Sequence, residues 1–195
     1  MTHDELNNLI REPLLRDRPS AIEVLRSYGW LLIPDVRTDL LSIGAQGVFH
    51  SLRPKTNIEA DFVTYEILQG RLHWQLVSVA PPSASIVDGS LLSTEFQDSL
   101  QQIERWRESV SRHGLAFPLK HTRPAAAGTL ISYRIIIGQS HQQTVEEQDA
   151  VRQSRRNDLR IRSFDWLLEK PVHYADIEIE LLNKISTAHS AELNN

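Results

Sequence analysis

The feature that most constrains the fold is a pair of strand-like runs around a short turn. Residues 61–67 and 72–79 are rich in β-branched and aromatic side chains, and Gln69-Gly70 lies between them. Two such runs around a glycine-containing turn predict an antiparallel hairpin. Pro81-Pro82 follows, and proline cannot donate to a strand ladder, so the second strand must end there or lie at a sheet edge. The middle of the chain is therefore expected to form a β-sheet.

Helical patterns lie on both sides of this hairpin. Apolar spacing predicts two short helices before it, at 3–17 and 20–28, separated at Pro19 with Ser20 as a candidate cap. The longest helical candidate follows the hairpin and a polar loop, at 93–112. The remaining patterns predict a buried strand within 128–138, a helix at 144–157, a strand at 159–164, a helix capped by Asp165, and a final helix at 174–185. This order predicts an α+β fold, a mixed sheet flanked by helices.

Composition places the chain among soluble globular proteins. It has 195 residues, of which 41% are hydrophobic and 24% charged, and it has no cysteine. This length favours one domain, which we place at residues 30–170. An N-terminal helical segment (1–29) precedes it, and a C-terminal helix and tail (171–195) follow it. No apolar run approaches the roughly 20 residues that cross a bilayer, and the charged N-terminus does not resemble a secretory signal. We expect a cytoplasmic protein with no membrane partner.

A run of arginines is the main candidate for nucleic-acid binding. The net charge is −4, but Lys and Arg outnumber Asp and Glu in residues 105–170. The run consists of Arg152, Arg155, Arg156, Arg160 and Arg162. Such a cluster can contact phosphates, which supply most of the sequence-independent affinity for DNA. Alternatively, it is a solvated helix face paired with neighbouring acidic residues, namely Glu146, Glu147, Asp149 and Asp158.

Several segments, in their order and spacing, resemble the PD-(D/E)XK nuclease-like domain of the Shedu antiviral-defence family. They fall within residues 30–170 and are Ala60-Asp61-Phe62-Val63, the run 71–77, Pro81-Pro82, Gln102-x-x-x-Trp106, Ile135-Ile136-Ile137-Gly138, and the strand-to-helix segment 161–168. The resemblance implies a restriction-endonuclease-like fold. It also implies DNA as the partner, defence against phage as the process, and a homo-oligomer as the assembly.

The resemblance also implies a particular chemistry. PD-(D/E)XK nucleases place an Asp at the start of one strand and a Glu-x-Lys on the next. The two carboxylates hold a divalent metal, usually Mg²⁺, and the lysine positions or activates water. Residues two apart on a strand face the same side, so the Glu and the Lys converge on one site. In this chain Asp61 matches the family's Asp, and Gln102 matches the glutamine of the following helix.

Two positions of the motif depart from the family. The alignment puts Ser78 at the glutamate and Ala80 at the lysine. Serine adds no negative charge for Mg²⁺, and alanine can neither polarise water nor neutralise a developing charge. If this register is right, the ordinary mechanism is not available. Candidates for relocated groups are Glu59, which would share a strand face with Asp61, and Glu23, Glu66 and Lys55. A solvated strand edge explains Glu59 and Glu66 equally well.

Three classes of function follow from these observations. The first is a catalytically degenerate nuclease-like domain that binds DNA or a partner in antiviral defence. The second is an active metal-dependent DNA endonuclease with relocated ligands, and the third is a structural oligomerisation module. The eight histidines are scattered without the spacing of a metal site. The retention of Asp61 and Gln102 beside altered positions 78 and 80 favours the first class.

Overall fold

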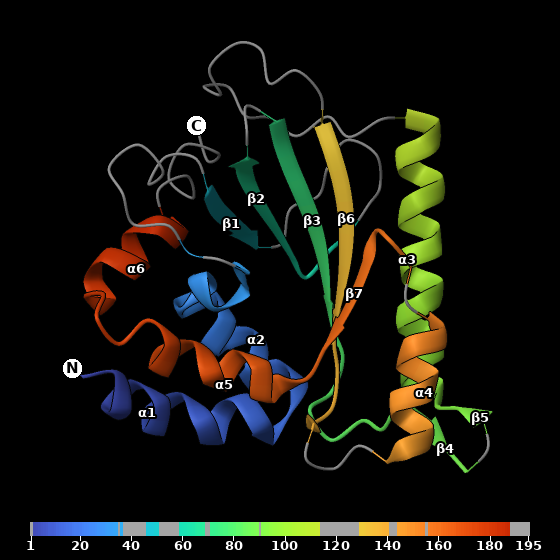
Figure 1. Cartoon of the computed structure of the whole chain (residues 1–195), viewed down its shortest axis with the longest axis horizontal. Coiled ribbons are helices and arrows are strands. Elements are labelled where there is room, and N and C mark those ends of the chain that lie inside the picture. The colour runs from blue at the N-terminus through green and yellow to red at the C-terminus, as the bar shows by residue number, and fades with distance from the viewer. Residues whose placement is uncertain are drawn as a thin grey trace.

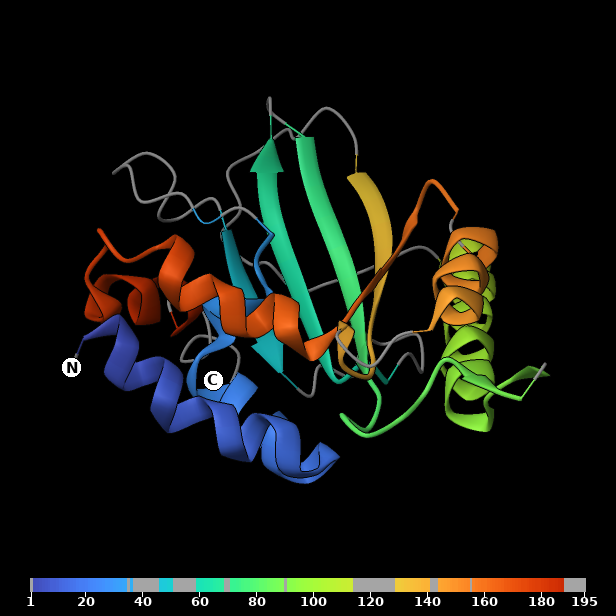
Figure 2. The ribbon, with the colours of Figure 1, turned by 60° about the horizontal axis from the view of Figure 1, so that its bottom comes forward.

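A computed structural model of the chain describes residues 2–34, 36, 46–50, 59–68, 71–89, 91–113, 129–140, 144–154 and 156–187. In this part of the chain, a five-stranded sheet lies between two layers of helices (Figures 1 and 2). The strand order is β1-β2-β3-β6-β7. The strands are β1 (Gln46–His50), β2 (Phe62–Leu68), β3 (Arg71–Val79), β6 (Thr129–Ile136) and β7 (Leu159–Arg162). The predicted mixed sheet flanked by helices is confirmed.

The sheet changes direction in its middle. β2 pairs with β1 and with β3 in antiparallel fashion. β6 pairs with β3 and with β7 in parallel fashion. Parallel neighbours need a long crossover connection. The 20-residue helix α3 (Thr94–His113) lies between β3 and β6 in the chain. The predicted pairing of the two strand-like runs is confirmed, whereas its turn at Gln69-Gly70 lies outside the described residues.

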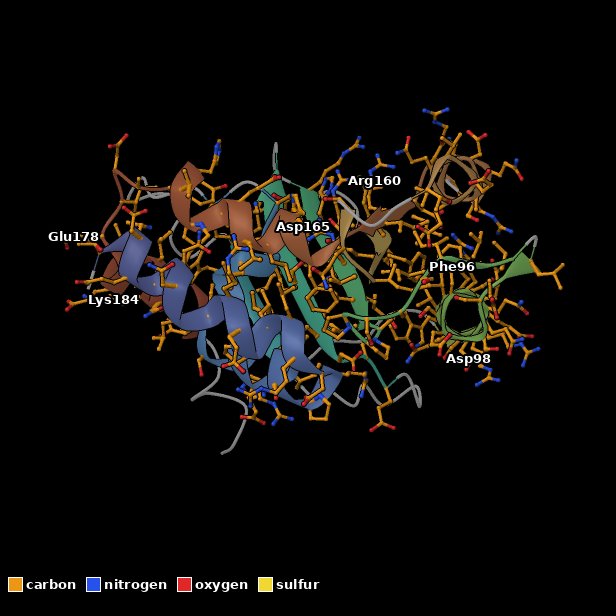
Figure 3. All side chains as sticks on the ribbon, turned by 90° about the horizontal axis from the view of Figure 1, so that it is seen from below. Phe96, Asp98, Arg160, Asp165, Glu178 and Lys184 are labelled. Atoms are coloured by element: carbon orange, nitrogen blue, oxygen red, sulfur yellow. The ribbon has the colours of Figure 1, made fainter. Side chains whose placement is uncertain are left out.

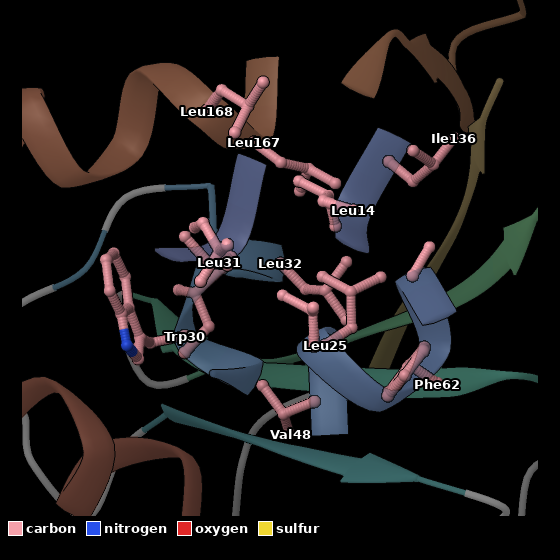
Figure 4. Packing of buried hydrophobic residues seen from close by; sticks show 14 of the residues in the cluster. Leu14, Leu25, Trp30, Leu31, Leu32, Val48, Phe62, Ile136, Leu167 and Leu168 are labelled. Atoms are coloured by element: carbon pink, nitrogen blue, oxygen red, sulfur yellow. The ribbon is translucent and has the colours of Figure 1, made fainter. Parts of the chain in front are cut away.

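One helical layer covers the first face of the sheet (Figure 1). It consists of α1 (His3–Arg16), α2 (Arg18–Ser27), the short 3₁₀ helix η1 (Gly29–Leu32), α5 (Phe164–His173) and α6 (Ile179–Thr187). The segment Trp30-Leu31-Leu32 is fully buried at the centre of this layer. It packs with side chains from both ends of the chain and from the sheet, among them Leu14, Leu25, Phe62, Ile136 and Leu167 (Figure 4). The first and last helices therefore share one core with the central strands.

The other layer consists of α3 and α4 (Val145–Ser154), which cover the second face. Because strand side chains alternate between faces, Ile135 and Ile137 point to this layer while Ile136 points to the first. Trp106 of α3 is buried here and stacks on Tyr133. The side chains of Phe62, Leu76, Ile103, Ile135 and Ile137, which divide between the two faces of the sheet, are all 0% exposed.

Three helix starts differ from the sequence predictions. α2 begins at Arg18, because Asp17 rather than Ser20 is its cap: the Asp17 carboxylate accepts a hydrogen bond from the Ser20 N–H. Pro19 is tolerated inside the first turn, where its missing N–H has no partner to lose. α5 follows Ser163 rather than Asp165, and the last helix begins at Ile179 rather than at Tyr174.

The loop expected at 83–92 contains a two-stranded hairpin of β4 (Val87–Asp88) and β5 (Leu91–Leu92). The sequence also has a strand-like run at 40–49, of which residues 46–49 lie in β1 and residues 40–45 lie outside the described ranges. No helix in the described ranges is long and apolar enough to cross a membrane.

Candidate functional site

The residues singled out by the nuclease resemblance meet where β2 begins and β3 ends. Asp61 immediately precedes β2, and the pairing of Phe62 with Val77 puts Asp61 opposite Ser78. α3 passes over this face of the sheet, and the Ser78 hydroxyl donates a 2.7 Å hydrogen bond to Oε1 of Gln102. Nε2 of Gln102 lies 3.4 Å from the Glu59 carbonyl oxygen. The structure therefore places Asp61 opposite Ser78 in the strand register and Gln102 in contact with Ser78.

The carboxylate of Asp61 has two partners. Its Oδ2 accepts a hydrogen bond from the Val79 N–H at 2.8 Å, and its Oδ1 lies 2.6 Å from Nη2 of Arg18. Nε of Arg18 also donates to the Val79 carbonyl oxygen at 2.7 Å. Arg18 and Asp61 thus bind each other and both polar groups of the Val79 backbone. The Asp61 side chain is 17% exposed and that of Arg18 is 46% exposed.

Arg18 was not among the residues expected at this site. It is the first residue of α2 and lies 43 positions before Asp61. Its position follows from the packing of the N-terminal helices against the sheet, for which the local sequence carries no signal. The positive charge that faces Asp61 therefore comes from the start of α2.

The two altered motif positions are both buried. Ser78 is 4% exposed and Ala80 is 5% exposed. The Ala80 N–H donates to the Ile136 carbonyl oxygen at 2.9 Å, and its methyl group belongs to the apolar cluster beneath α3. Position 80 is thus part of the hydrophobic core.

The side chains at positions 61, 78 and 80 do not fit Mg²⁺, which prefers several anionic oxygens as ligands. Arg18 and the Val79 N–H occupy the Asp61 carboxylate, Ser78 donates its hydroxyl proton to Gln102, and Ala80 has no donor atom. Glu23 does not supply the missing carboxylate, because its side chain is 69% exposed and forms an ion pair with Arg26 at 2.5 Å. Within the described ranges, His, Asp and Glu side chains form no group of three that could hold a metal ion.

The other candidate carboxylates lie elsewhere. Glu59 is exposed, and its backbone carbonyl is what contacts Gln102. Glu66 lies on β2 an even number of residues from Phe62, so it faces the layer of α1 and α5. Lys55 lies outside the described residues.

The arginine run is divided between two elements. Arg152 and Arg156 are exposed near α4, and each is paired: Arg152 with Asp149 at 3.1 Å and Arg156 with Glu104 at 3.0 Å. Arg155 lies outside the described residues. The paired-face interpretation is confirmed for Arg152 and Asp149. For Asp158 it is wrong, because that carboxylate binds Arg107 of α3 through two hydrogen bonds of 2.7 and 3.0 Å.

Arg160 and Arg162 belong to a second group of cations. On β7 they alternate with the buried Leu159 and Ile161 and face the layer of α1 and α5. Arg134 of β6 pairs in register with Arg160, so these two residues are neighbours on the same face. Figure 3 shows Arg160 on the β7 side of the sheet, between the two helical layers. Arg134 was taken for a buried strand residue and not for part of a site.

Comparison with known proteins does not assign the chain to a family. No protein-family model matches it, and no curated protein matches it.

Proposed function

We propose that this chain is a Shedu-like domain of the restriction-endonuclease-like fold that acts in antiviral defence by binding DNA, without the metal-dependent cleavage of its active relatives. The observation that carries this proposal is the binding of Asp61 by Arg18 and by the Val79 N–H. Asp61 is the one carboxylate of the motif that this chain retains. In the proposed protein it holds the N-terminal helices to the sheet.

The neighbouring positions support the same conclusion. A magnesium ion at Asp61 would have to displace the Arg18 guanidinium, and it would find no second carboxylate at position 78. At position 80 a buried methyl group stands where the lysine would act on water. The hydrogen bond between Ser78 and Gln102 gives the altered position a partner of its own, so no polar group is left unpaired there.

The test is to rebuild the motif in steps. Ser78→Glu with Ala80→Lys restores the family's residues, and Arg18→Gln releases Asp61. We expect the parent chain to leave plasmid DNA intact in the presence of Mg²⁺. We expect nicking from the triple variant, and less from the double variant in which Arg18 still neutralises Asp61.

The control is Asp61→Asn in the triple variant, which keeps a hydrogen-bond acceptor for Val79 but removes the charge. This change should abolish the acquired nicking. Nicking by the parent chain that disappears with Asp61→Asn would overturn the proposal and favour the active nuclease with relocated ligands.

DNA binding is measured separately on the parent chain. Contacts to phosphates release counterions, so the affinity for duplex DNA should fall steeply with salt. An absence of DNA binding at low salt would contradict the proposed role and favour the third class of function, an oligomerisation module.

A further inference from the structure

Arg134 is a buried cation with unsatisfied hydrogen-bonding capacity. It is 3% exposed, and its Nη1 donates to the Leu32 carbonyl oxygen at 2.5 Å. Its Nε is buried and has no hydrogen-bond partner among the described residues. No carboxylate of those residues forms an ion pair with it. Buried arginines are ordinarily paired, because an uncompensated charge in the interior is costly.

Other cations gather at the same place around the Trp166 ring of α5. The Arg134 guanidinium carbon lies 4.6 Å from the ring centroid, that of Arg162 lies 6.0 Å away, and Nζ of Lys170 lies 4.6 Å away. Arg160 lies next to Arg134 in the sheet register and is exposed. The cluster therefore extends from a buried arginine to the protein surface.

Among the described residues, Glu66 and Asp165 are acidic groups on the elements around this cluster. Glu66 of β2 raises the pKa of Arg134, but burial, Arg162 and Arg160 oppose it and lower that pKa to about 9. Asp165, at the start of α5, accepts hydrogen bonds from the Ser140 backbone and hydroxyl. Nζ of Lys170 is directed at two carbonyl oxygens, those of Ile33 and Pro34. Positive charge is thus in excess at Arg134 and Arg160.

We propose that Arg134, Arg160 and Arg162 form a phosphate-binding site on the face of β6 and β7. In the proposed function, on which this assignment of the source rests, the phosphate belongs to the DNA backbone. Arginine presents several N–H donors in a planar fork that matches the oxygens of phosphate. Arg134 is held in place by Leu32 and Trp166 and provides a fixed positive charge, while Arg160 and Arg162 contact the anion nearer the surface.

The proposed site includes only part of the arginine run that the sequence shows. Arg152 and Arg156 have carboxylate partners at 3.1 and 3.0 Å, which already neutralise them. They provide a matched control, because removing them changes the net charge by the same two units as removing Arg160 and Arg162. If phosphate binds at a defined site, the two double changes should lower DNA affinity by unequal amounts. If only general electrostatic attraction acts, they should lower it equally.

The experiment compares Arg160→Gln/Arg162→Gln with Arg152→Gln/Arg156→Gln in the full chain, after thermal unfolding has verified that both variants fold. The first probe is a labelled short DNA duplex, titrated over a series of salt concentrations. We expect the first variant to lose about tenfold or more in affinity and its salt slope to fall by about 2, one for each lost phosphate contact. The control variant should change much less. A third variant, Arg134→Lys, keeps the charge but loses the fork, and it should also bind less tightly.

The second probe is inorganic phosphate at matched ionic strength, which separates the site from the source of the phosphate. Phosphate should raise the melting temperature of the parent chain more than that of the Arg160→Gln/Arg162→Gln variant. Stabilisation by phosphate without any binding of DNA would support the site and overturn the proposed DNA-binding function. Equal loss of DNA affinity in both double variants would overturn the site and leave the proposed function standing. Binding of neither probe would overturn both.

Discussion

Arg18 and Asp61 bind each other at 2.6 Å, and each also binds the backbone of Val79, one through its carbonyl oxygen and the other through its N–H. This arrangement joins the N-terminal helix α2 to the beginning of β2 and the end of β3. It gives the Asp61 carboxylate a structural role, and that role can be measured.

Asp61→Ala should destabilise the fold more than Arg18→Ala does. The first change leaves the part-buried Val79 N–H without its acceptor, which costs about 1–3 kcal/mol. The Arg18 side chain is 46% exposed, so solvent screens its ion pair, and its loss should cost about 1 kcal/mol or less. Chemical denaturation of both variants measures the free energies of unfolding. The reverse order would show that Arg18, and not Asp61, holds this corner together.

Gly138→Ala should be much more damaging than Gly89→Ala. Both glycines have a positive φ, 61° and 60°, which costs an L-residue about 1–2 kcal/mol. A Cβ at Gly138 would also lie 2.6 Å from the Ala84 carbonyl oxygen, whereas at Gly89 it would meet nothing within 4 Å. The difference between the two variants in free energy of unfolding isolates this contact. Equal losses would mean that the segment around Ala84 moves aside without cost.

Ile136→Ala and Ile137→Ala should each cost about 2–5 kcal/mol of stability. The two side chains are 0% exposed and lie on opposite faces of the sheet, so each truncation leaves a cavity in a different cluster. Leu91→Ala is the control, because Leu91 is 72% exposed and should change stability by no more than about 0.5 kcal/mol. A loss as small as this at either isoleucine would contradict the placement of β6 in the interior of the sheet, between β3 and β7.

Arg134 should make the stability of the fold rise with pH in the alkaline range. Its pKa is lowered from 12.5 to about 9 by burial first and by neighbouring arginines second. Above pH of about 9 the unfolded chain therefore binds more protons than the folded one, and the free energy of unfolding increases with pH. Below that pH both states are protonated and this dependence vanishes.

The measurement is the difference in pH dependence between the parent chain and Arg134→Met, from neutral pH to about pH 10. The subtraction removes the contributions of other titrating groups that the two proteins share. Parallel curves would show that Arg134 keeps an ordinary pKa and is compensated by a partner. The same comparison in phosphate should flatten the rise, because a bound anion stabilises the protonated arginine.

The sequence predicted the elements that local patterns determine. The hairpin of β2 and β3 follows from two β-branched runs, and the burial of Ile103, Ile135 and Ile137 follows from their spacing in amphipathic or strongly apolar segments. The expectation that Ser78 and Gln102 lie together rested on the resemblance and not on a local pattern, and the two side chains share a hydrogen bond.

The features that could not be predicted from the sequence depend on contacts between segments that are distant along the chain. Arg18 lies beside Asp61 because α2 packs across the end of the sheet, and Arg134 joins Arg160 because β6 and β7 are parallel neighbours. The arginines between 152 and 162 are close together along the chain, but they lie on different elements. Arg160 and Arg162 lie on one face of β7, whereas Arg152 lies on the helix α4. The caps at Asp17 and Ser163 were misplaced because neighbouring Ser20 and Asp165 are also good cap residues.

Whether the site around Asp61 cleaves DNA can be measured by incubating the purified parent chain with supercoiled plasmid and Mg²⁺, beside the Asp61→Ala variant. The quantity measured is the rate at which supercoiled DNA becomes nicked. We expect the two rates to be equal and indistinguishable from the rate without protein. Nicking by the parent chain that Asp61→Ala removes would contradict it.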